Sequence, residues 1–266
     1  MTVIYGVLVV CGACIVAVVG LMLVQRFVPA AIREEHNDVA GFIYAALGVI
    51  YAVLLALVVI AVWEEFGRAR VTVESEANAL AEIFWLAHQL PEPERHHLQE
   101  LARSYAEEVV DGEWPLMQRG ETPLMEQSTQ ATPRGWVLID DIRATVQGYE
   151  PRTESEQELY AQGLDQVQRL ADARRTRLVA AEESIPAVLW VVLVVGGMVA
   201  VGFTYLFGLE HTGAHALMVA SLAGVIALVL FTIGILDHPF SGGARIEPGA
   251  FELVLNRFET SKLSDL

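Results

Sequence analysis

Charged residues are missing from four long stretches of this 266-residue chain. These stretches cover residues 3–24, 39–63, 185–209 and 216–236. Each has about 20 residues or more, which lets a helix cross a hydrocarbon layer of about 30 Å. Backbone amides in lipid must pair within their own segment, so an open sheet is excluded. We therefore predict an all-α, polytopic membrane protein with four transmembrane helices.

Chemical motifs and basic residues are also scarce. The chain contains no G-x-S-x-G motif, phosphate loop or dinucleotide fingerprint, so no enzyme and no cofactor are predicted. Its 17 basic residues face 33 acidic ones, and the net charge of −16 argues against binding to nucleic acid. The two cysteines, Cys11 and Cys14, lie inside the first apolar stretch, where a shared helical face indicates packing rather than redox chemistry.

Three histidines raise the alternative of a metal site. His88, His96 and His97 lie on both sides of Pro91 and lack the i, i+4 pairing that helical metal sites use. Surface or packing roles fit this spacing better. We predict no metal site.

The basic residues that exist are unevenly placed, and this predicts the topology. Cytoplasmic flanks of membrane helices are enriched in arginine and lysine. If both termini are cytoplasmic, the outer loops hold Arg26 and Arg33. The inner flanks then hold Arg68, Arg70, Arg174, Arg175, Arg177, Arg245, Arg257 and Lys262. This count predicts a protein of the cell membrane with both ends in the cytoplasm.

The same topology divides the chain into four segments. Residues 1–63 hold the first two spans with a short outside loop, and residues 185–236 hold the last two. Between them, residues 64–184 form a cytoplasmic helical domain, and residues 237–266 form a cytoplasmic turn followed by an amphipathic helix.

Within the predicted cytoplasmic domain, helical periodicity dominates. The second span continues as a helix toward Pro91, and Thr153 with Glu156 has the spacing of a capping box. We expect an exposed loop at residues 111–135, which hold several prolines and polar residues. In the final helix, one apolar face is predicted to pack on this domain or on a neighbouring subunit. That face consists of Phe251, Val254, Leu255 and Phe258.

Several of these stretches resemble the bestrophin-like membrane proteins of the class DUF4239. The similar segments are "EHNDVAGFIYAALGVIYAVLLALVVIAVWEEF", "ESEANALAEIFWLA", "VGFTYLFG" and "LDHPFSG", which together extend over about residues 39–258. The resemblance implies a relation to bestrophins, which are ring-shaped oligomeric ion channels with four spans per subunit. It further implies that the second span lines a pore and that helical cytosolic parts form a vestibule. A homo-oligomer is therefore expected, with a pentamer as one candidate.

The second span carries the residues expected at such a pore. One stripe combines small and aromatic residues, and an aliphatic stripe runs beside it. The candidate pore-lining residues are Gly41, Tyr44, Leu47, Gly48, Tyr51, Leu54 and Leu55. The alternative is close helix packing through Gly41 and Gly48, with the aliphatic stripe facing lipid. No span has a charge at its centre, which disfavours a transporter but not an apolar pore.

Acidic residues lie at both ends of the second span. In a ring they would form two collars that attract cations: Glu34, Glu35 and Asp38 before the span, and Glu64 and Glu65 after it. Residues 64–184 contain twice as many acids as arginines, which adds to this field. We therefore predict conduction of monovalent ions with cations favoured over chloride, although the best-known bestrophins conduct anions. The alternative is an ordinary solvated surface.

The turn after the fourth span, "DHPFSGG", marks the end of the apolar run. Asp237 and His238 are candidates for a cytoplasmic gate, Pro239 stops the helix and Phe240 is expected at the lipid headgroups. The alternative is a simple structural turn. A second hypothesis for the whole chain is a non-conducting signalling or scaffold protein that recruits a partner through its cytoplasmic domain.

Overall fold

The computed structural model describes residues 2–28, 33, 37–121, 133–209 and 211–264. Within these ranges the chain is helical and has no strand, which confirms the prediction of an all-α fold. Packing divides it into two units. The membrane unit comprises Met1–Glu64 and Ser184–Asp237, and the bundle comprises Glu65–Glu183 and His238–Leu266.

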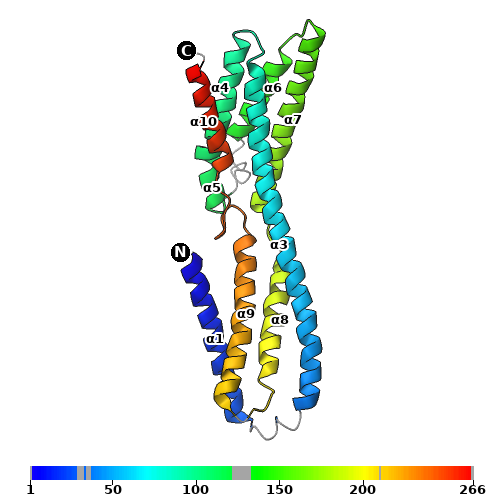
Figure 1. The fold of residues 1–266 in the computed structure, drawn as a ribbon, viewed down its shortest axis with the longest axis vertical. Coiled ribbons are helices and arrows are strands. Elements are labelled where there is room, and N and C mark those ends of the chain that lie inside the picture. The colour runs from blue at the N-terminus through cyan, green and yellow to red at the C-terminus, as the bar shows by residue number, and fades with distance from the viewer. Residues whose placement is uncertain (1, 29–32, 34–36, 122–132, 210, 265–266) are drawn as a thin grey trace. The chain divides into compact units, whose positions relative to one another are not determined.

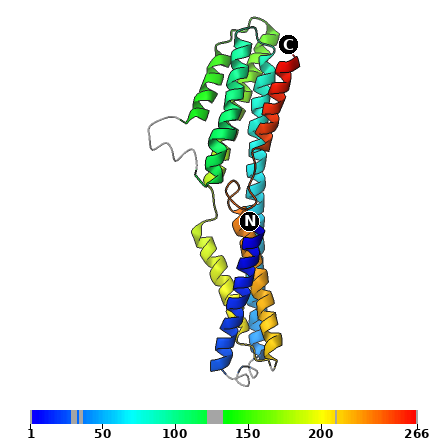
Figure 2. The same cartoon turned by 90° about the vertical axis from the view of Figure 1, so that its left-hand side faces the viewer.

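Four helices of the membrane unit are long and apolar enough to cross a bilayer, as predicted. They are α1 (Thr2–Phe27), the first part of α3 (Asn37–Ala87), α8 (Ala187–Thr204) and α9 (Thr212–Leu236). Helix α1 packs along α9, and α8 contacts both (Figures 1 and 2). No more than 33% of the most apolar window of any of these helices is buried within the chain. Lipid or other protein copies must therefore cover most of their surface.

Small residues allow neighbouring helices of this unit to approach each other closely. Tyr51 of α3 lies directly over Gly196 and Gly197 of α8, where an added Cβ would be 2.7 Å and 2.9 Å from its side chain. Cys14 of α1 lies beside Gly224 of α9, and its thiol donates to the carbonyl of Ala220 at 3.3 Å. Cys14 therefore has a packing role, and both cysteines are free thiols.

In its described residues, the bundle comprises the rest of α3 and six further helical segments. These are α4 (Glu94–Glu107), the π-helix η1 (Glu108–Glu113), α5 (Trp114–Gln118), α6 (Arg134–Gln147), α7 (Glu154–Glu182) and α10 (Gly249–Ser264). Helix α6 packs on α4 and α7, and α10 packs on α4 (Figure 1). The predicted capping box is present at the start of α7, where the side chains of Thr153 and Glu156 each accept a hydrogen bond from the backbone amide of the other residue.

One apolar core holds the bundle together. Phe84 of α3 stacks on Phe258 of α10 with ring centroids 3.8 Å apart, and Leu98 and Tyr105 of α4 are fully buried. Phe251 and Val254 are buried in the same core, so the final helix packs on its own subunit. This resolves the choice that the sequence left open between the domain and a neighbouring copy.

Candidate functional site

The second span presents two chemically different sides. On its inner side, Tyr44 stacks on Phe203 with centroids 5.8 Å apart, and the Tyr51 hydroxyl donates to the Leu193 carbonyl at 2.8 Å. Leu47, Leu54 and Leu55 pack in the same cluster as Tyr51. These five residues of the predicted pore-lining set thus face α8 and α9 of their own subunit.

The two predicted glycines lie differently. A Cβ at Gly41 would be 3.9 Å from Phe207, whereas a Cβ at Gly48 would meet nothing within 4 Å. The outer side of the span is aliphatic and uncovered. Its exposed residues include Phe42, Ile43, Val49, Ile50, Val53, Leu57 and Ile60.

The described acidic residues at the ends of the span face outward. Asp38 and Glu64 are exposed, and Glu65 forms an ion pair with Arg68 at 2.6 Å one turn further on. Glu34 and Glu35 of the predicted outer collar lie outside the described residues. The carboxylates of Asp38 and Glu64 are therefore exposed, while Glu65 is partly neutralised.

Hydrogen bonds hold both ends of the turn that follows the fourth span. The Asp237 carboxylate accepts hydrogen bonds from the Ile185 backbone amide at 2.6 Å and from the Trp190 indole at 3.2 Å. It thereby ties the end of α9 to the start of α8. His238 is exposed, and Pro239 is buried, with its carbonyl accepting from the Ile246 amide at 2.8 Å.

Phe240 does not lie where the sequence suggested. We expected it at the lipid headgroups, but its side chain is 2% exposed and contacts Trp114 edge to face at 5.7 Å. The expectation was wrong because the buried Trp114 provides an aromatic partner inside the bundle core. A large apolar ring gains more from this burial than from an interfacial position.

Sequence reasoning missed a buried charge network in the bundle core. Arg177 binds both oxygens of Glu76, at 2.6 and 3.0 Å, and one oxygen of Glu113 at 2.7 Å. Arg174 makes a bidentate pair with Glu113 at 2.5 and 3.0 Å. Tyr105 donates its hydroxyl proton to Glu76 at 2.5 Å. We call these five residues the charge network.

Electrostatics fix the protonation of Glu113 and Tyr105 in this network. Burial alone would raise the pKa of Glu113, but the positive charges of Arg177 and Arg174 outweigh it and leave this pKa below its ordinary value. Burial and the neighbouring Glu76 raise the pKa of the Tyr105 hydroxyl well above its usual range. Glu113 therefore stays ionised near neutral pH and Tyr105 stays protonated.

The network corrects the expectation of an exposed loop at residues 111–135. Residues up to Gln118 continue the helical path as η1 and α5, and both Glu113 and Trp114 are buried. Residues 122–132 lie outside the described ranges. The expectation failed because Glu113 has its cationic partners on α7, some sixty residues away in the chain. A signal was present, since Arg174 and Arg177 extend the apolar stripe of Val167, Leu170 and Ala171.

Two of the three histidines considered for a metal site, His88 and His96, have local partners. His88 stacks on Trp85 with ring centroids 5.2 Å apart, and His96 lies 3.3 Å from Glu100 on the surface of α4. Within the described part of the chain, no three histidine, cysteine or acidic side chains are arranged to hold a metal ion.

Comparisons with known proteins identify the class of this membrane protein. The family model of the bestrophin-like domain matches residues 11–251, so the chain belongs to the bestrophin-like family. This confirms the resemblance inferred from the sequence. A search of curated protein sequences finds no match.

Two solved structures share the fold. One is the crystal structure of a membrane protein carrying a single substitution, with a TM-score of 0.70, 12% identity, and coverage of 94% of this chain and 97% of that chain. The other is a bacterial bestrophin homologue from Klebsiella pneumoniae carrying a point mutation, with the same TM-score and identity and coverage of 94% and 98%. The fold is therefore bestrophin-like over nearly its whole length.

Proposed function

We propose that this protein is a homo-oligomeric ion channel whose pore is bordered by α3 from each subunit. The family membership and the shared fold support this class. One observation carries the proposal: α3 has an uncharged aliphatic face that is long enough to cross a bilayer and that its own subunit leaves uncovered. Such a face can line an apolar constriction when several copies meet at an axis.

The packing of α3 supports a choice of pore residues on its other side. The aromatic side of α3 is engaged with α8, so Tyr44 and Tyr51 support the pore wall from behind. We propose that Ile43, Ile50 and Leu57, which share the exposed side of α3, border the path. Ile50 and Leu57 are 72% and 62% exposed in the isolated chain.

We further propose that both termini and the bundle are cytoplasmic. Arg174 and Arg177 are buried in the charge network and do not act as membrane flanks. The remaining basic residues still favour this orientation, with Arg68, Arg70, Arg175, Arg245, Arg257 and Lys262 opposed to Arg26 and Arg33.

The selectivity proposal rests on charge. Exposed Asp38 and Glu64, at the two ends of the apolar part of α3, would form acidic rings, and the acidic bundle would raise the local concentration of cations. Monovalent cations should therefore pass more readily than chloride. The proposed pentamer is one ring that would bring these carboxylates close together.

Currents across planar bilayers test the proposal. Purified protein under a KCl gradient should give a reversal potential displaced toward the potassium equilibrium value. Asp38→Asn with Glu64→Gln should move that potential toward the chloride value. A reversal potential at the chloride value in the unmodified protein would refute cation preference but not conduction.

Cysteine accessibility tests the pore face. In a background with Cys11 and Cys14 replaced by alanine, a positively charged methanethiosulfonate reagent should reduce the current of Ile50→Cys. Val192→Cys on α8, 43% exposed, provides the matched control that should not respond. Block at the control position alone would place the pore elsewhere. An intact oligomer that carries no current under varied pH and calcium would favour the alternative, a non-conducting scaffold or signalling protein.

A further inference from the structure

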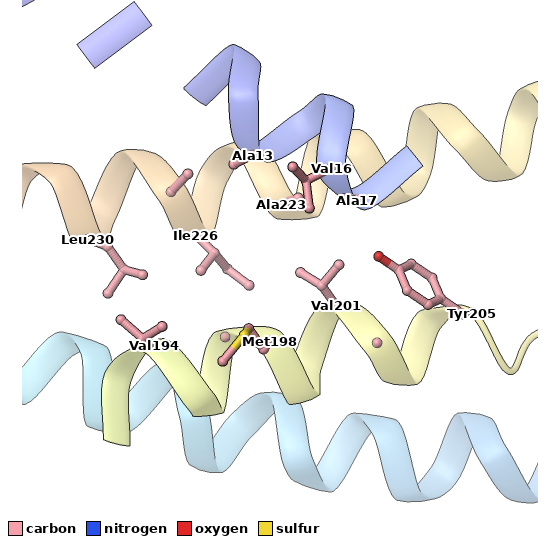
Figure 3. Close-up of a pocket in the computed structure, with 13 residues that line it drawn as sticks. Ala13, Val16, Ala17, Val194, Met198, Val201, Tyr205, Ala223, Ile226 and Leu230 are labelled. Atoms are coloured by element: carbon pink, nitrogen blue, oxygen red, sulfur yellow. The ribbon is translucent and has the colours of Figure 1, made fainter. Parts of the chain in front are cut away.

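The membrane unit contains an apolar crevice of about 330 Å³ between α1, α8 and α9. Val16 on α1 and Met198 on α8 form its two walls, and Ile226 of α9 lies between them (Figure 3). Its volume is close to the lower end for small-molecule sites, about 300–1,000 Å³. The crevice is too apolar to hold ordered water, which needs several polar partners.

The crevice has the depth of one lipid leaflet. On α8 it extends from Val194 to Tyr205, a rise of about 16 Å at 1.5 Å per residue. That is about half of a hydrocarbon core of about 30 Å. A single acyl chain extends over the same depth.

One end of the crevice is polar, as a lipid binding site requires. Tyr205 lines this end, and its backbone carbonyl accepts a hydrogen bond from Arg33 at 3.1 Å. His215 lies 3.0 Å from the neighbouring Thr204 carbonyl, and Gln25 lies 3.4 Å from His215. These groups mark the level where apolar surroundings end and where the ester and headgroup of a lipid would lie.

The crevice and α3 lie on opposite sides of α8 (Figure 3). Gly197 lines the crevice, and a Cβ on this glycine would be 2.9 Å from the Tyr51 hydroxyl of α3. If α3 of every copy lies at the shared axis, as the proposed function requires, α8 separates the crevice from that axis and the crevice adjoins the bilayer. We propose that the crevice binds one acyl chain of a bilayer phospholipid.

Gly202 allows a direct test, because it lines the crevice and a Cβ there would meet nothing within 4 Å. Gly202→Leu should fill the crevice without disturbing the helices. Gly12→Leu is the matched control, since Gly12 also has open space within a span but does not line the crevice. Both variants should retain the thermal stability of the unmodified protein.

The probe is a phosphatidylcholine with a diazirine-labelled palmitoyl chain, photolysed in phosphatidylcholine vesicles and mapped by mass spectrometry. Adducts should form at Val16 and Met198, be lost in Gly202→Leu, and persist in Gly12→Leu. Adducts at Val3, which is 79% exposed and does not line the crevice, should persist in both variants. Unchanged adducts at Met198 in Gly202→Leu would overturn the inference, as would a disulfide between copies at Met198→Cys in the background without Cys11 and Cys14.

Adduct formation does not need ion flow, so the two proposals can fail separately. Adducts in a protein that carries no current would refute the channel and keep the lipid site. Current without crevice adducts would keep the channel and refute the lipid site.

Discussion

The two units of this chain bury different kinds of side chain. The bundle has one continuous core of large apolar and aromatic residues, and inside it lie Glu76, Glu113, Arg174 and Arg177 with almost no exposure. Among the described residues of the membrane unit the buried clusters are small, as around Leu21 and Ala223 and around Tyr51 and Ala200. Its close approaches depend on glycine, as at Gly196 and Gly197.

The solvent explains this difference. In water, apolar burial drives association, and a large core can enclose paired charges whose hydrogen bonds are complete. In lipid, apolar side chains gain nothing by leaving the surroundings, so helices associate through backbone proximity and a few hydrogen bonds. The stability of the bundle should therefore fall most when a buried charge loses its partner. The stability of the membrane unit should fall most when an added side chain fills the space between two helices.

Removal of one acid from the charge network should have the largest effect. Glu113→Ala leaves the buried Arg174 without its carboxylate and Arg177 with one instead of two. Breaking a buried pair in this way costs about 3–5 kcal/mol of unfolding free energy. Thermal unfolding of the purified protein, followed by tryptophan fluorescence, should show a clear loss of stability.

A surface pair on the same helix provides the control for that experiment. Asp172 and Arg175 of α7 pair at 3.0 Å with both side chains exposed, so Asp172→Asn should cost at most about 1 kcal/mol. Equal losses in the two variants would mean that burial of the network has no special energetic weight.

Low pH should reduce the stability of the bundle by protonating Glu113 of the charge network. Because the folded-state pKa of Glu113 is lowered, its contribution is fully present above the unfolded value of 4.5. That contribution is lost as the pH falls through the folded pKa. The unfolding temperature of the unmodified protein should fall more between pH 6 and pH 3 than that of Glu113→Gln. Parallel curves for the two proteins would contradict this assignment.

The sequence predicts the fold better than it predicts contacts between distant residues. Uncharged runs of sufficient length specify the four spans, and the local Thr153–Glu156 spacing specifies a helix start. These features depend on neighbouring residues alone. Glu113 looked like part of a solvated loop because its partners on α7 are distant in the chain.

The sequence was sufficient to select the second span as the candidate site. It was not sufficient to tell which side of that helix is left uncovered. Both stripes of the second span are uncharged, and either could face a pore. The choice depends on which residues of α8 meet them, and Gly196 and Gly197 accept the Tyr51 ring there. Sequence periodicity cannot distinguish an aromatic stripe that lines a path from one that packs on two glycines.

An added side chain between two packed helices should have the next largest effect on stability, and this effect should be confined to the membrane unit. A Cβ at Gly196 would be 2.7 Å from the Tyr51 ring, so Gly196→Ala forces the ring or α8 to move. Overpacking of this kind costs about 1–3 kcal/mol. Gly202→Ala, six residues further along α8 with open space beside it, should be neutral or gain up to about 1 kcal/mol. Thermal unfolding in detergent measures both, and equal behaviour would remove Tyr51 from the contact.

The smallest effect should follow from Tyr51→Phe, which keeps the ring and removes the hydrogen bond to Leu193. Hydrogen bonds between membrane helices contribute about 0.6 kcal/mol on average, so the unfolding temperature should fall slightly. Because the structure places Tyr51 against α8, single-channel conductance should not change. If Tyr51 instead lines a water-filled path, as its stripe alone suggested, loss of the hydroxyl would alter conductance while stability stayed the same. A change in unfolding temperature without a change in conductance would support the proposed pore on the aliphatic side of α3. A change in conductance without a change in unfolding temperature would support a pore on the aromatic side.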